Sequence, residues 1–348
     1  MNETLLRVDN LKTSFMTSNG EVQAVRGVSF EVKRAEIVGI VGESGSGKSI
    51  TNMSLLKLLP DTAVIKDGSV MFQGRDLTKL SMKELREIRG EKIAMIFQDP
   101  MSSLNPLIPV GDQVAEMIRI HHRDKSREAV KQEVLKRFVE VRIPEPEKRY
   151  HAYPHEFSGG MRQRVMIAMA LANNPELLIA DEPTTALDVT IQDQIIRQMR
   201  ELKEQHGTSI IFITHDLGVI AELCEKVEVM YGGLIMEEAP IDAVFSSPHH
   251  PYTMGLLNSI PQLGQDRGRR LVPIPGSPPD MTNPPKGCPF APRCPYARAL
   301  CAEELPDFYE VGRGHRARCW LLDEEAPGEN NPFSNQSDRS LRSSDQAI

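Results

Sequence analysis

The fold is decided by the stretch Ile37-Val38-Gly39-Ile40-Val41-Gly42-Glu43-Ser44-Gly45-Ser46-Gly47-Lys48-Ser49. It begins as a buried parallel strand, continues as the pattern G-x-x-x-x-G-K-[ST], and leads into a helix that we expect over Lys48–Leu59. The glycines let backbone N–H groups face a phosphate, the Lys48 ammonium adds positive charge, and the Ser49 hydroxyl can bind Mg²⁺. The stretch therefore predicts a nucleotide triphosphate site with the candidate residues Gly42, Glu43, Ser44, Gly45, Ser46, Gly47, Lys48, Ser49 and Ile50.

Two further apolar segments continue the strand pattern along the chain. Leu177–Ala180 and Ser209–Thr214 have the unbroken apolar character of buried parallel strands, and the amphipathic stretch Ile191–Gln205 between them is typical of a helix. Short β-rich runs lie before the phosphate loop, at Leu5–Val8 and Val22–Val32. Strands that alternate with helices in this way predict an α/β fold, here a P-loop NTPase sheet core.

The stretch between Gln98 and Asp181 is mostly helical in pattern, and its clearest helices are Val110–His121 and Ser126–Val141. We expect a helical subdomain at about 99–165, inserted in a sheet domain of residues 1–247.

After Phe245 the composition shifts towards proline, which predicts a small Cys/Pro-rich C-terminal domain over residues 248–322. Residues 323–348 are polar and poor in apolar side chains, as is typical of a disordered tail.

Polar residues follow three of the predicted strands. Asp181 and Glu182 end the Leu177–Ala180 strand, so both carboxylates should reach the sheet edge that carries the phosphate loop. There Asp181 suits Mg²⁺, directly or through water, and Glu182 suits polarisation of the attacking water. His215 could hydrogen-bond the γ-phosphate or position Glu182, and Gln98 could sense Mg²⁺ or the water. A lone histidine after a strand is also often only a cap, and Gln98 alone is an equally weak signal.

A second glycine-rich turn opens a helix at Phe157-Ser158-Gly159-Gly160-Met161-Arg162-Gln163. Such a turn is a second phosphate cradle. One monomer has no evident use for two cradles on one γ-phosphate, so the sequence indicates a dimer that shares its nucleotides.

Four of the five cysteines are crowded near the C-terminal end, with the spacing C-x5-C-x6-C-x17-C. In a cytosolic protein this crowding favours a metal over disulfides. The candidate ligands are Cys288, Cys294, Cys301 and Cys319. Four thiolates can bind Zn²⁺ or a [4Fe–4S] cluster, and unligated thiols remain a further alternative. Cys224 lies apart and is expected to be a small core residue.

The net charge of −7 and the pI near 5.8 argue against a chain whose main partner is nucleic acid. The sequence has no apolar run long enough to span a bilayer, and its polar start, Met1-Asn2-Glu3-Thr4, lacks the features of a signal peptide. We therefore expect a soluble, cytoplasmic protein.

Taken together, the motifs of residues 1 to about 245 resemble the nucleotide-binding subunits of ABC transporters. The set, in the family's order and spacing, is Phe15, the phosphate loop, Gln98, Ser158-Gly159-Gly160, Asp181-Glu182, Ala186-Leu187-Asp188 and His215. The resemblance implies that Phe15 stacks on adenine, that the Ser158–Gly160 turn serves a partner's nucleotide, and that Asp188 crosses the dimer interface. Met161 replaces the commonest residue of the signature, Gln, but the backbone N–H groups do not depend on it.

The C-terminal segment resembles the extension of oligopeptide and dipeptide importer ATPases. The resemblance rests on His249-His250-Pro251-Tyr252-Thr253 and Ile274-Pro275-Gly276-Ser277-Pro278-Pro279-Asp280. Importers of this kind carry a cysteine set reported to hold an iron–sulfur cluster, so a [4Fe–4S] cluster is the first expectation here and zinc the second. The adjacent histidines also invite a metal interpretation. Nothing near them in the sequence completes a site, so we expect a helix start or a packing role.

The resemblance implies an ATP-hydrolysing subunit, with ATP and Mg²⁺, of an importer for oligopeptides or dipeptides, peripheral on the cytoplasmic face of the membrane. Its implied partners are a paralogous second ATPase subunit in a heterodimer, two transmembrane permeases and, indirectly, an extracytoplasmic substrate-binding protein. In the family, the helical subdomain and the segment after Gln98, here Asp99–Pro106, form a groove for a short permease helix.

Alternatives remain open at the level of sequence. Relatives with this extension also carry nickel or other small solutes. A soluble ABC ATPase that acts on nucleic acid or ribosomes is an alternative of another class, and a redox sensor with a secondary ATPase is a third.

Overall fold

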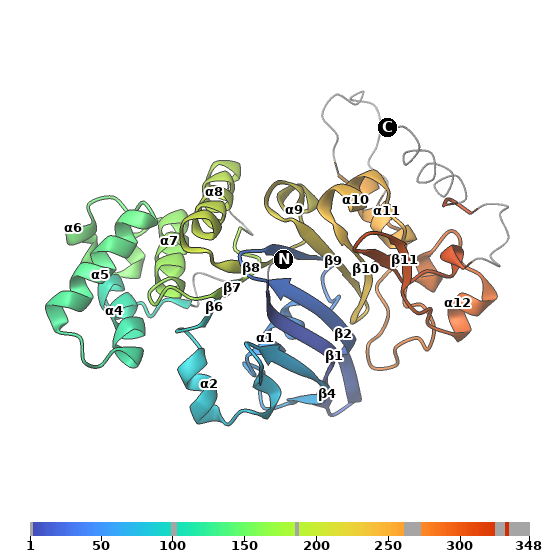
Figure 1. Ribbon diagram of the computed structural model, residues 1–348, viewed down its shortest axis with the longest axis horizontal. Helices are drawn as coiled ribbons and strands as arrows, with labels where there is room; N and C mark the ends of the chain where they lie inside the picture. Colours follow the sequence, from blue (N-terminus) through green and yellow to red (C-terminus); the bar gives the residue numbers. More distant parts are fainter. Residues whose placement is uncertain (1–2, 99–102, 185–187, 261–272, 324–330, 334–348) are drawn as a thin grey trace.

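The computed structural model describes residues 3–98, 103–184, 188–260, 273–323 and 331–333, which form two sheets flanked by helices (Figure 1). The strands are β1 (Thr4–Thr17), β2 (Gly20–Lys33), β3 (Ile37–Val41), β4 (Ala63–Phe72), β5 (Arg75–Asp76), β6 (Ile93–Ile96), β7 (Leu177–Asp181), β8 (Ser209–Thr214), β9 (Lys226–Tyr231), β10 (Leu234–Pro240), β11 (Tyr309–Gly312) and β12 (His315–Ala317).

The α-helices are α1 (Lys48–Leu55), α2 (Met82–Ile88), α4 (Val110–His121), α5 (Arg127–Glu140), α6 (Pro146–Tyr150), α7 (Gly159–Ala170), α8 (Val189–His206), α9 (Leu217–Leu223), α10 (Ile241–Ser246), α11 (Pro251–Asn258) and α12 (Ala299–Glu303). Short 3₁₀ turns are η1 (Leu77–Lys79), η2 (Pro154–Glu156), η3 (Ala291–Arg293) and η4 (Trp320–Leu322).

The main sheet is mixed and has the strand order β11-β12-β10-β9-β3-β8-β7-β6. Its part from β9 to β6 is parallel, whereas β10, β12 and β11 pair antiparallel. Because the carboxyl ends of parallel strands meet at one edge, the residues that follow β3, β6, β7 and β8 lie together. The predicted α/β class is confirmed.

Each face of the main sheet has its own core, since alternate residues of a strand point to opposite faces. Ile179 packs into a cluster with the smaller sheet, of order β2-β1-β4-β5, and with α1. Its neighbours Leu178 and Ala180 pack on the opposite face, in a cluster with residues of α4, α5, α7, α8 and α9. The strand β3, which leads into the phosphate loop, is therefore packed on both of its faces.

The two helices predicted between Gln98 and Asp181 are present as α4 and α5. Ser126 caps α5, because its hydroxyl accepts the N–H of Ala129 at 3.2 Å. Figure 1 shows α4, α5, α6 and α7 grouped at the β6 end of the main sheet, while the C-terminal segment lies at the opposite end. Within the described ranges, no helix is both long and apolar enough to cross a membrane.

Helix α1 is shorter than the sequence predicts, because it ends at Leu55 rather than Leu59. Lys57 adopts a left-handed backbone conformation with φ of 50°. Pro60 follows shortly, and a proline disfavours helical geometry in the residue before it. The apolar leucines 55, 56 and 58 had extended the helical pattern past the point where the backbone leaves the helix.

The C-terminal segment packs against the main sheet. β12 pairs with β10 and β11 pairs with β12, so both extend the edge of that sheet. Tyr252, Cys288 and Phe290 belong to the same hydrophobic cluster as the sheet residue Val229. The segment thus shares the core of the preceding residues, and the predicted domain boundary at 247/248 stays a prediction.

Part of the predicted tail is ordered against this segment. Phe333 is buried beside Cys319 and Leu321 and stacks on the ring of His249, with ring centroids 5.6 Å apart. The polar composition of residues 323–348 did not indicate this contact, because a single aromatic side chain supplies it. Residues 324–330 and 334–348 lie outside the described residues.

His250 caps α11, which confirms a helix-start role for this histidine. Its Nδ1 accepts the N–H of Tyr252 at 3.0 Å, so Nδ1 carries no proton and the imidazole is neutral. Burial lowers the pKa of His250 from 6.5 to about 4. The stability that this cap contributes is therefore fully present above pH 6.5 and is lost as the pH falls towards 4.

We expect His250→Asn to make the protein less sensitive to acid. Asparagine keeps a helix-capping acceptor but does not titrate. Between about pH 7 and about pH 5 the wild type should lose about 2 kcal/mol more of its free energy of unfolding than the variant does. Urea unfolding of both proteins at both pH values measures this, since the other titrating groups cancel in the comparison. Equal losses would show that His250 is not the acid-sensitive group.

Candidate functional site

The phosphate loop takes the shape that its glycines permit. Gly45 and Gly47 have φ of 79° and 101°, a region that side chains disfavour. At Gly42 the backbone passes so close to β9 that a Cβ atom would lie 2.2 Å from the carbonyl oxygen of Met230. The loop thus needs glycine both for its turns and for its approach to the sheet.

The Lys48 side chain points back into the loop. Its Nζ donates to the carbonyl oxygens of Gly42 at 2.7 Å and Glu43 at 3.0 Å. Burial lowers the pKa of Lys48, and the nearby carboxylates, led by that of Glu182, oppose the shift. A buried ammonium of this kind is stabilised further by a phosphate, which fits the predicted role.

The predicted catalytic residues converge at the same sheet edge. The Ser49 hydroxyl donates to Oδ1 of Asp181 at 3.0 Å. Gln98 Nε2 donates to Oε2 of Glu182 at 3.1 Å, and Nδ1 of His215 lies 3.6 Å from that same oxygen. Burial raises the pKa of Asp181, while its bond from Ser49 opposes the shift. Hydroxyl and carboxylate oxygens are the ligands that Mg²⁺ prefers, so Ser49 and Asp181 fit this ion.

Glu182 has a strained backbone, with φ of 47° in the left-handed region that non-glycine residues rarely adopt. Its N–H donates to the carbonyl oxygen of Ile213 in β8 at 2.9 Å. Strain held by the surrounding structure is typical of functional positions. Here it turns the carboxylate towards Gln98 and His215.

The two other candidates, Phe15 and Ile50, belong to elements next to the phosphate loop. Phe15 is half-buried on β1, and β1 is tied to α1 by the hydroxyls of Thr13 and Ser54, 2.9 Å apart. Ile50 packs against the core between the sheets, so only its backbone is available to a phosphate.

The Ser158–Gly160 turn opens helix α7, as the sequence predicts. The Ser158 hydroxyl caps α7 by accepting the N–H of Met161 at 3.3 Å. The carbonyl oxygen of Ser158 accepts the N–H of Arg162 at 2.9 Å, and Nε of Arg162 donates to the carbonyl oxygen of Pro154 at 2.8 Å. A Cβ atom at Gly159 would meet nothing within 4 Å, whereas one at Gly160 would lie 3.2 Å from Ile191. Packing within the chain therefore does not explain the glycine at 159.

Asp188 caps α8, because its carboxylate accepts the N–H of Ile191 at 2.9 Å. Ile191 also contacts Gly160, so this cap and the second cradle are neighbours. The rest of the Ala186-Leu187-Asp188 motif, at 186 and 187, lies outside the described residues.

The candidate cysteine ligands gather in one part of the C-terminal segment, and all four are free thiols. Burial raises the pKa of Cys319, and the neighbouring thiols of Cys288, Cys294 and Cys301 raise it further. The N–H of Cys288 donates to the carbonyl oxygen of Cys301 at 2.8 Å, which holds two of these segments together. Cys224 is buried in the main core, as predicted.

The positions of the four sulfurs can be compared with the geometry of a zinc site. Tetrahedral Zn²⁺ would hold its thiolates about 3.8 Å apart, given bonds of about 2.3 Å. Among the described residues, the one group of three possible ligands with donor atoms within 4.8 Å of one another is Glu237, His249 and His315. No three of the four cysteine sulfurs meet this condition.

Glu237 and His315 are partners of His249 that the sequence pattern did not indicate. The Glu237 carboxylate accepts the N–H groups of His249 and His250, at 2.7 Å and 3.0 Å, and lies 2.7 Å from Nε2 of His315. Nδ1 of His249 donates to the carbonyl oxygen of Ser247 at 2.7 Å. Through these hydrogen bonds, Glu237 on β10 holds the start of α11 and the strand β12 in place.

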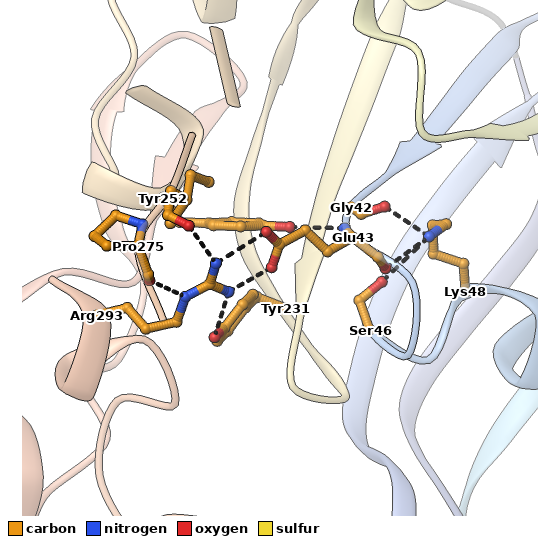
Figure 2. Close-up of polar contacts among 9 residues, drawn as sticks. Gly42, Glu43, Ser46, Lys48, Tyr231, Tyr252, Pro275 and Arg293 are labelled. Carbon is orange, nitrogen blue, oxygen red and sulfur yellow. Dashed lines mark hydrogen bonds and ion pairs between the residues drawn. The ribbon is translucent and has the colours of Figure 1, made fainter. Parts of the chain in front are cut away.

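A contact between the C-terminal segment and the phosphate loop was also not foreseen (Figure 2). The Arg293 guanidinium pairs with the Glu43 carboxylate through two nitrogen–oxygen contacts, at 2.5 Å and 3.0 Å. The Tyr252 hydroxyl accepts the N–H of Glu43 at 2.8 Å. The bond to Glu43 raises the pKa of Arg293. No sequence pattern signals this pair, because 250 positions separate its members.

Two family models match separate parts of the chain. The family described as "ABC transporter" matches residues 25–185, which include the phosphate loop, Gln98 and Asp181. The family described as "Oligopeptide/dipeptide transporter, C-terminal region" matches residues 236–301, which include Glu237, Tyr252 and Arg293.

Individual relatives match almost the whole chain. An "Oligopeptide transport ATP-binding protein OppD" of Bacillus subtilis (strain 168) is 53% identical over 93% of this chain and 90% of that protein. A "Dipeptide transport ATP-binding protein DppD" of the same organism is 50% identical over 93% of this chain and 96% of that protein. The OppD of Escherichia coli (strain K12) is 49% identical over 93% of this chain and 95% of its own length.

Solved structures share the fold of the ATP-binding part. A dimeric structure of a post-hydrolysis state of the ATP-binding cassette MJ0796, bound to ADP and Pi, has a TM-score of 0.62 and 29% identity. The match covers 68% of this chain and 98% of that one.

Proposed function

Because this chain belongs to the family of ABC transporter ATP-binding subunits for oligopeptides and dipeptides, we propose that it binds and hydrolyses ATP to power peptide uptake through membrane permeases. The observation that carries the proposal is the convergence of Ser49, Asp181, Glu182, Gln98 and His215 at one sheet edge, beside the loop that holds Lys48. The names of the relatives give no support to nickel import or to action on nucleic acid.

In this proposal each residue has one task at the γ-phosphate. Lys48 and the loop N–H groups bind the β- and γ-phosphates, and Ser49 and Asp181 hold Mg²⁺. Glu182 orients and polarises the attacking water, since its carboxylate is aimed by Gln98 and His215. Phe15 stacks on the adenine. This division of labour supplies positioning and electrostatic stabilisation, which are what phosphoryl transfer requires.

The dimer is the second part of the proposal. The Ser158–Gly160 turn would bind the γ-phosphate of a partner ATPase subunit, and Asp188 would lie at the interface between them. The open space around Gly159 supports this, because its own chain does not require a glycine there. A similar ATP-binding cassette is dimeric in its post-hydrolysis state. We infer a paralogous partner in a heterodimer.

A groove beside the helical subdomain supports docking of a permease. It has a volume of about 280 Å³ and is lined by apolar side chains that include Phe97, Met117, Met166 and Met169. Phe97 is 44% exposed, and flexible methionines adapt well to a partner helix. On the cytoplasmic face of the membrane, this subunit would dock on two transmembrane permeases. An extracytoplasmic binding protein would supply them with peptide and complete the importer. Residues 99–102 of the predicted docking segment lie outside the described residues.

For the C-terminal segment we propose a Cys/Pro-rich domain over 248–322 whose cysteines hold a [4Fe–4S] cluster, with zinc as the alternative. The support is the gathering of four free thiols in one part of the segment. Cys288, Cys294, Cys301 and Cys319 would be the ligands, and the metal would staple a segment poor in apolar residues.

Glu182→Gln should keep ATP binding and remove hydrolysis at this subunit's own site. The amide preserves shape but cannot polarise the water, so phosphate release should fall by about 10²-fold or more. Glu201→Gln is the matched control, since the side chain of Glu201 on α8 is 41% exposed and pairs with the exposed Arg142. Full-rate hydrolysis at both sites of the assembled complex would refute the role of Glu182.

Gly159→Leu should leave the chain folded and stop ATP-driven association. A Cβ atom at position 159 meets nothing of its own chain within 4 Å. In the proposed dimer, the leucine side chain would occupy the space of the partner's phosphate. Arg127→Leu is the control, because Arg127 is likewise the first residue of a helix capped by serine. Sedimentation with ATP, in a Glu182→Gln background and with the partner subunit, measures association. Unchanged association of the Gly159 variant would exclude this turn from the interface.

Metal analysis of the anaerobically purified protein tests the cysteine proposal. A visible absorption band with iron and sulfide at cluster stoichiometry is expected, and Cys294→Ser should reduce both. A colourless protein with stoichiometric zinc would show that the cysteines bind zinc and not a cluster. A protein free of metal would show that the four thiols are unligated.

A further inference from the structure

We propose that Arg293, from the cysteine-bearing segment, is a positioning residue of the nucleotide site, which holds Glu43 and thereby the phosphate loop in its binding conformation. The inference rests on the proposed function, since it concerns the same ATP site. It adds a residue 250 positions away from the loop, on a segment that carries none of the nucleotide-binding motifs.

The pair has the geometry of a strong contact. Nη1 of Arg293 lies 2.5 Å from Oε2 of Glu43, and Nη2 lies 3.0 Å from Oε1, so both carboxylate oxygens are engaged side by side. The Arg293 side chain is only 4% exposed, and that of Glu43 is 28% exposed. Partial burial and two-point contact distinguish this pair from surface ion pairs, which contribute little.

Arg293 is also fixed from its own side. Nε donates to the carbonyl oxygen of Pro275 at 2.8 Å, Nη2 to that of Ile274 at 3.1 Å, and Nη1 to the Tyr231 hydroxyl at 3.1 Å (Figure 2). Each of the three guanidinium nitrogens therefore has a hydrogen-bond partner other than Glu43. A side chain held in this way presents a rigid surface to the loop, because little rotamer freedom is left.

The Glu43 peptide is held at its other atoms as well. Its N–H donates to the hydroxyl of Tyr252, and its carbonyl oxygen accepts Nζ of Lys48 at 3.0 Å. Tyr252 is fully buried, and its own N–H is held by His250. Glu43 thus links the C-terminal segment on one side to the phosphate-binding lysine on the other. A shift of Glu43 would move the ammonium of Lys48 and the N–H groups of the loop.

The same contact connects the cysteine-bearing segment to the nucleotide. Arg293 ends the turn η3, which lies between Cys288 and Cys294, and directly precedes Cys294. A change in the backbone of this turn would be transmitted to Glu43 without any intermediate residue. The segment thus acts on nucleotide affinity in addition to stabilising the fold.

A double-mutant cycle on the full-length chain tests the proposal. Titration with a fluorescent ATP analogue gives the dissociation constant of the wild type, Arg293→Gln, Glu43→Gln and the double variant, and thermal unfolding without nucleotide gives their stability. Each single variant should bind about tenfold more weakly, and the double variant no more weakly than the weaker single one, because the two residues act as a unit. In the assembled complex the loss should appear in KM for ATP, with kcat nearly unchanged.

Arg316→Gln is the matched control. Arg316 lies on β12 in the same segment and pairs with Glu238, with Nε 2.7 Å from Oε2, away from the phosphate loop. It should lower the unfolding temperature and leave the dissociation constant unchanged. Tyr252→Phe, which removes only the hydroxyl that accepts the Glu43 N–H, provides a second route if Arg293→Gln fails to fold, and should weaken binding severalfold.

The outcomes separate the two proposals. Wild-type protein that binds no ATP would refute the proposed function itself. Wild-type binding with unchanged dissociation constants in Arg293→Gln and Tyr252→Phe would overturn the positioning role, as would single effects that multiply in the double variant. If Arg316→Gln weakened nucleotide binding as much as Arg293→Gln does, the positioning role would also be overturned. The effect would then come from a general loss of stability in the segment.

Discussion

The parallel pairing of β3, β8 and β7 is the constraint on which the rest of the site depends. Val41 pairs with Thr214, and Asp181 pairs with Ile213. The phosphate loop, His215 and Glu182 therefore begin at nearly the same height along three adjacent strands. A slip of one residue would displace a strand by about 3.3 Å and turn its side chains to the opposite face. Two separate cores, one on each face of the sheet, exclude such a slip.

Burial of charge is the consequence of this arrangement. Lys48 and Asp181 lie at the strand edge, and each is only 5% exposed. Burial lowers the pKa of the ammonium and raises the pKa of the carboxyl group, so in both cases it disfavours the charged form. The hydrogen bonds that Lys48 donates to the loop carbonyls, and the one that Asp181 accepts from Ser49, offset part of the cost. Phosphates and a divalent cation would offset more, and the site is thus prepared for charged ligands.

The C-terminal segment is joined to the site through a chain of polar contacts. Glu237 on β10 holds the backbone of His249 and His250, and His250 caps the helix that carries Tyr252. Tyr252 and Arg293 then meet Glu43 in the phosphate loop. Because β11 and β12 also continue the main sheet, this segment and the ATPase core form one packed body around the loop.

The α/β class, the phosphate loop and the residues that follow each strand could be predicted from the sequence, because these depend on local patterns: apolar runs, glycine positions and strand ends. The sequence also predicts that four cysteines bind one metal group. Local patterns misplaced the end of α1, where Lys57 leaves the helix, and missed the packing of Phe333. The folded chain alone shows that Arg293 pairs with Glu43 and that Glu237 contacts His249 and His315. Those contacts join residues far apart in the chain, and their partners are selected by packing, which no short stretch of sequence encodes.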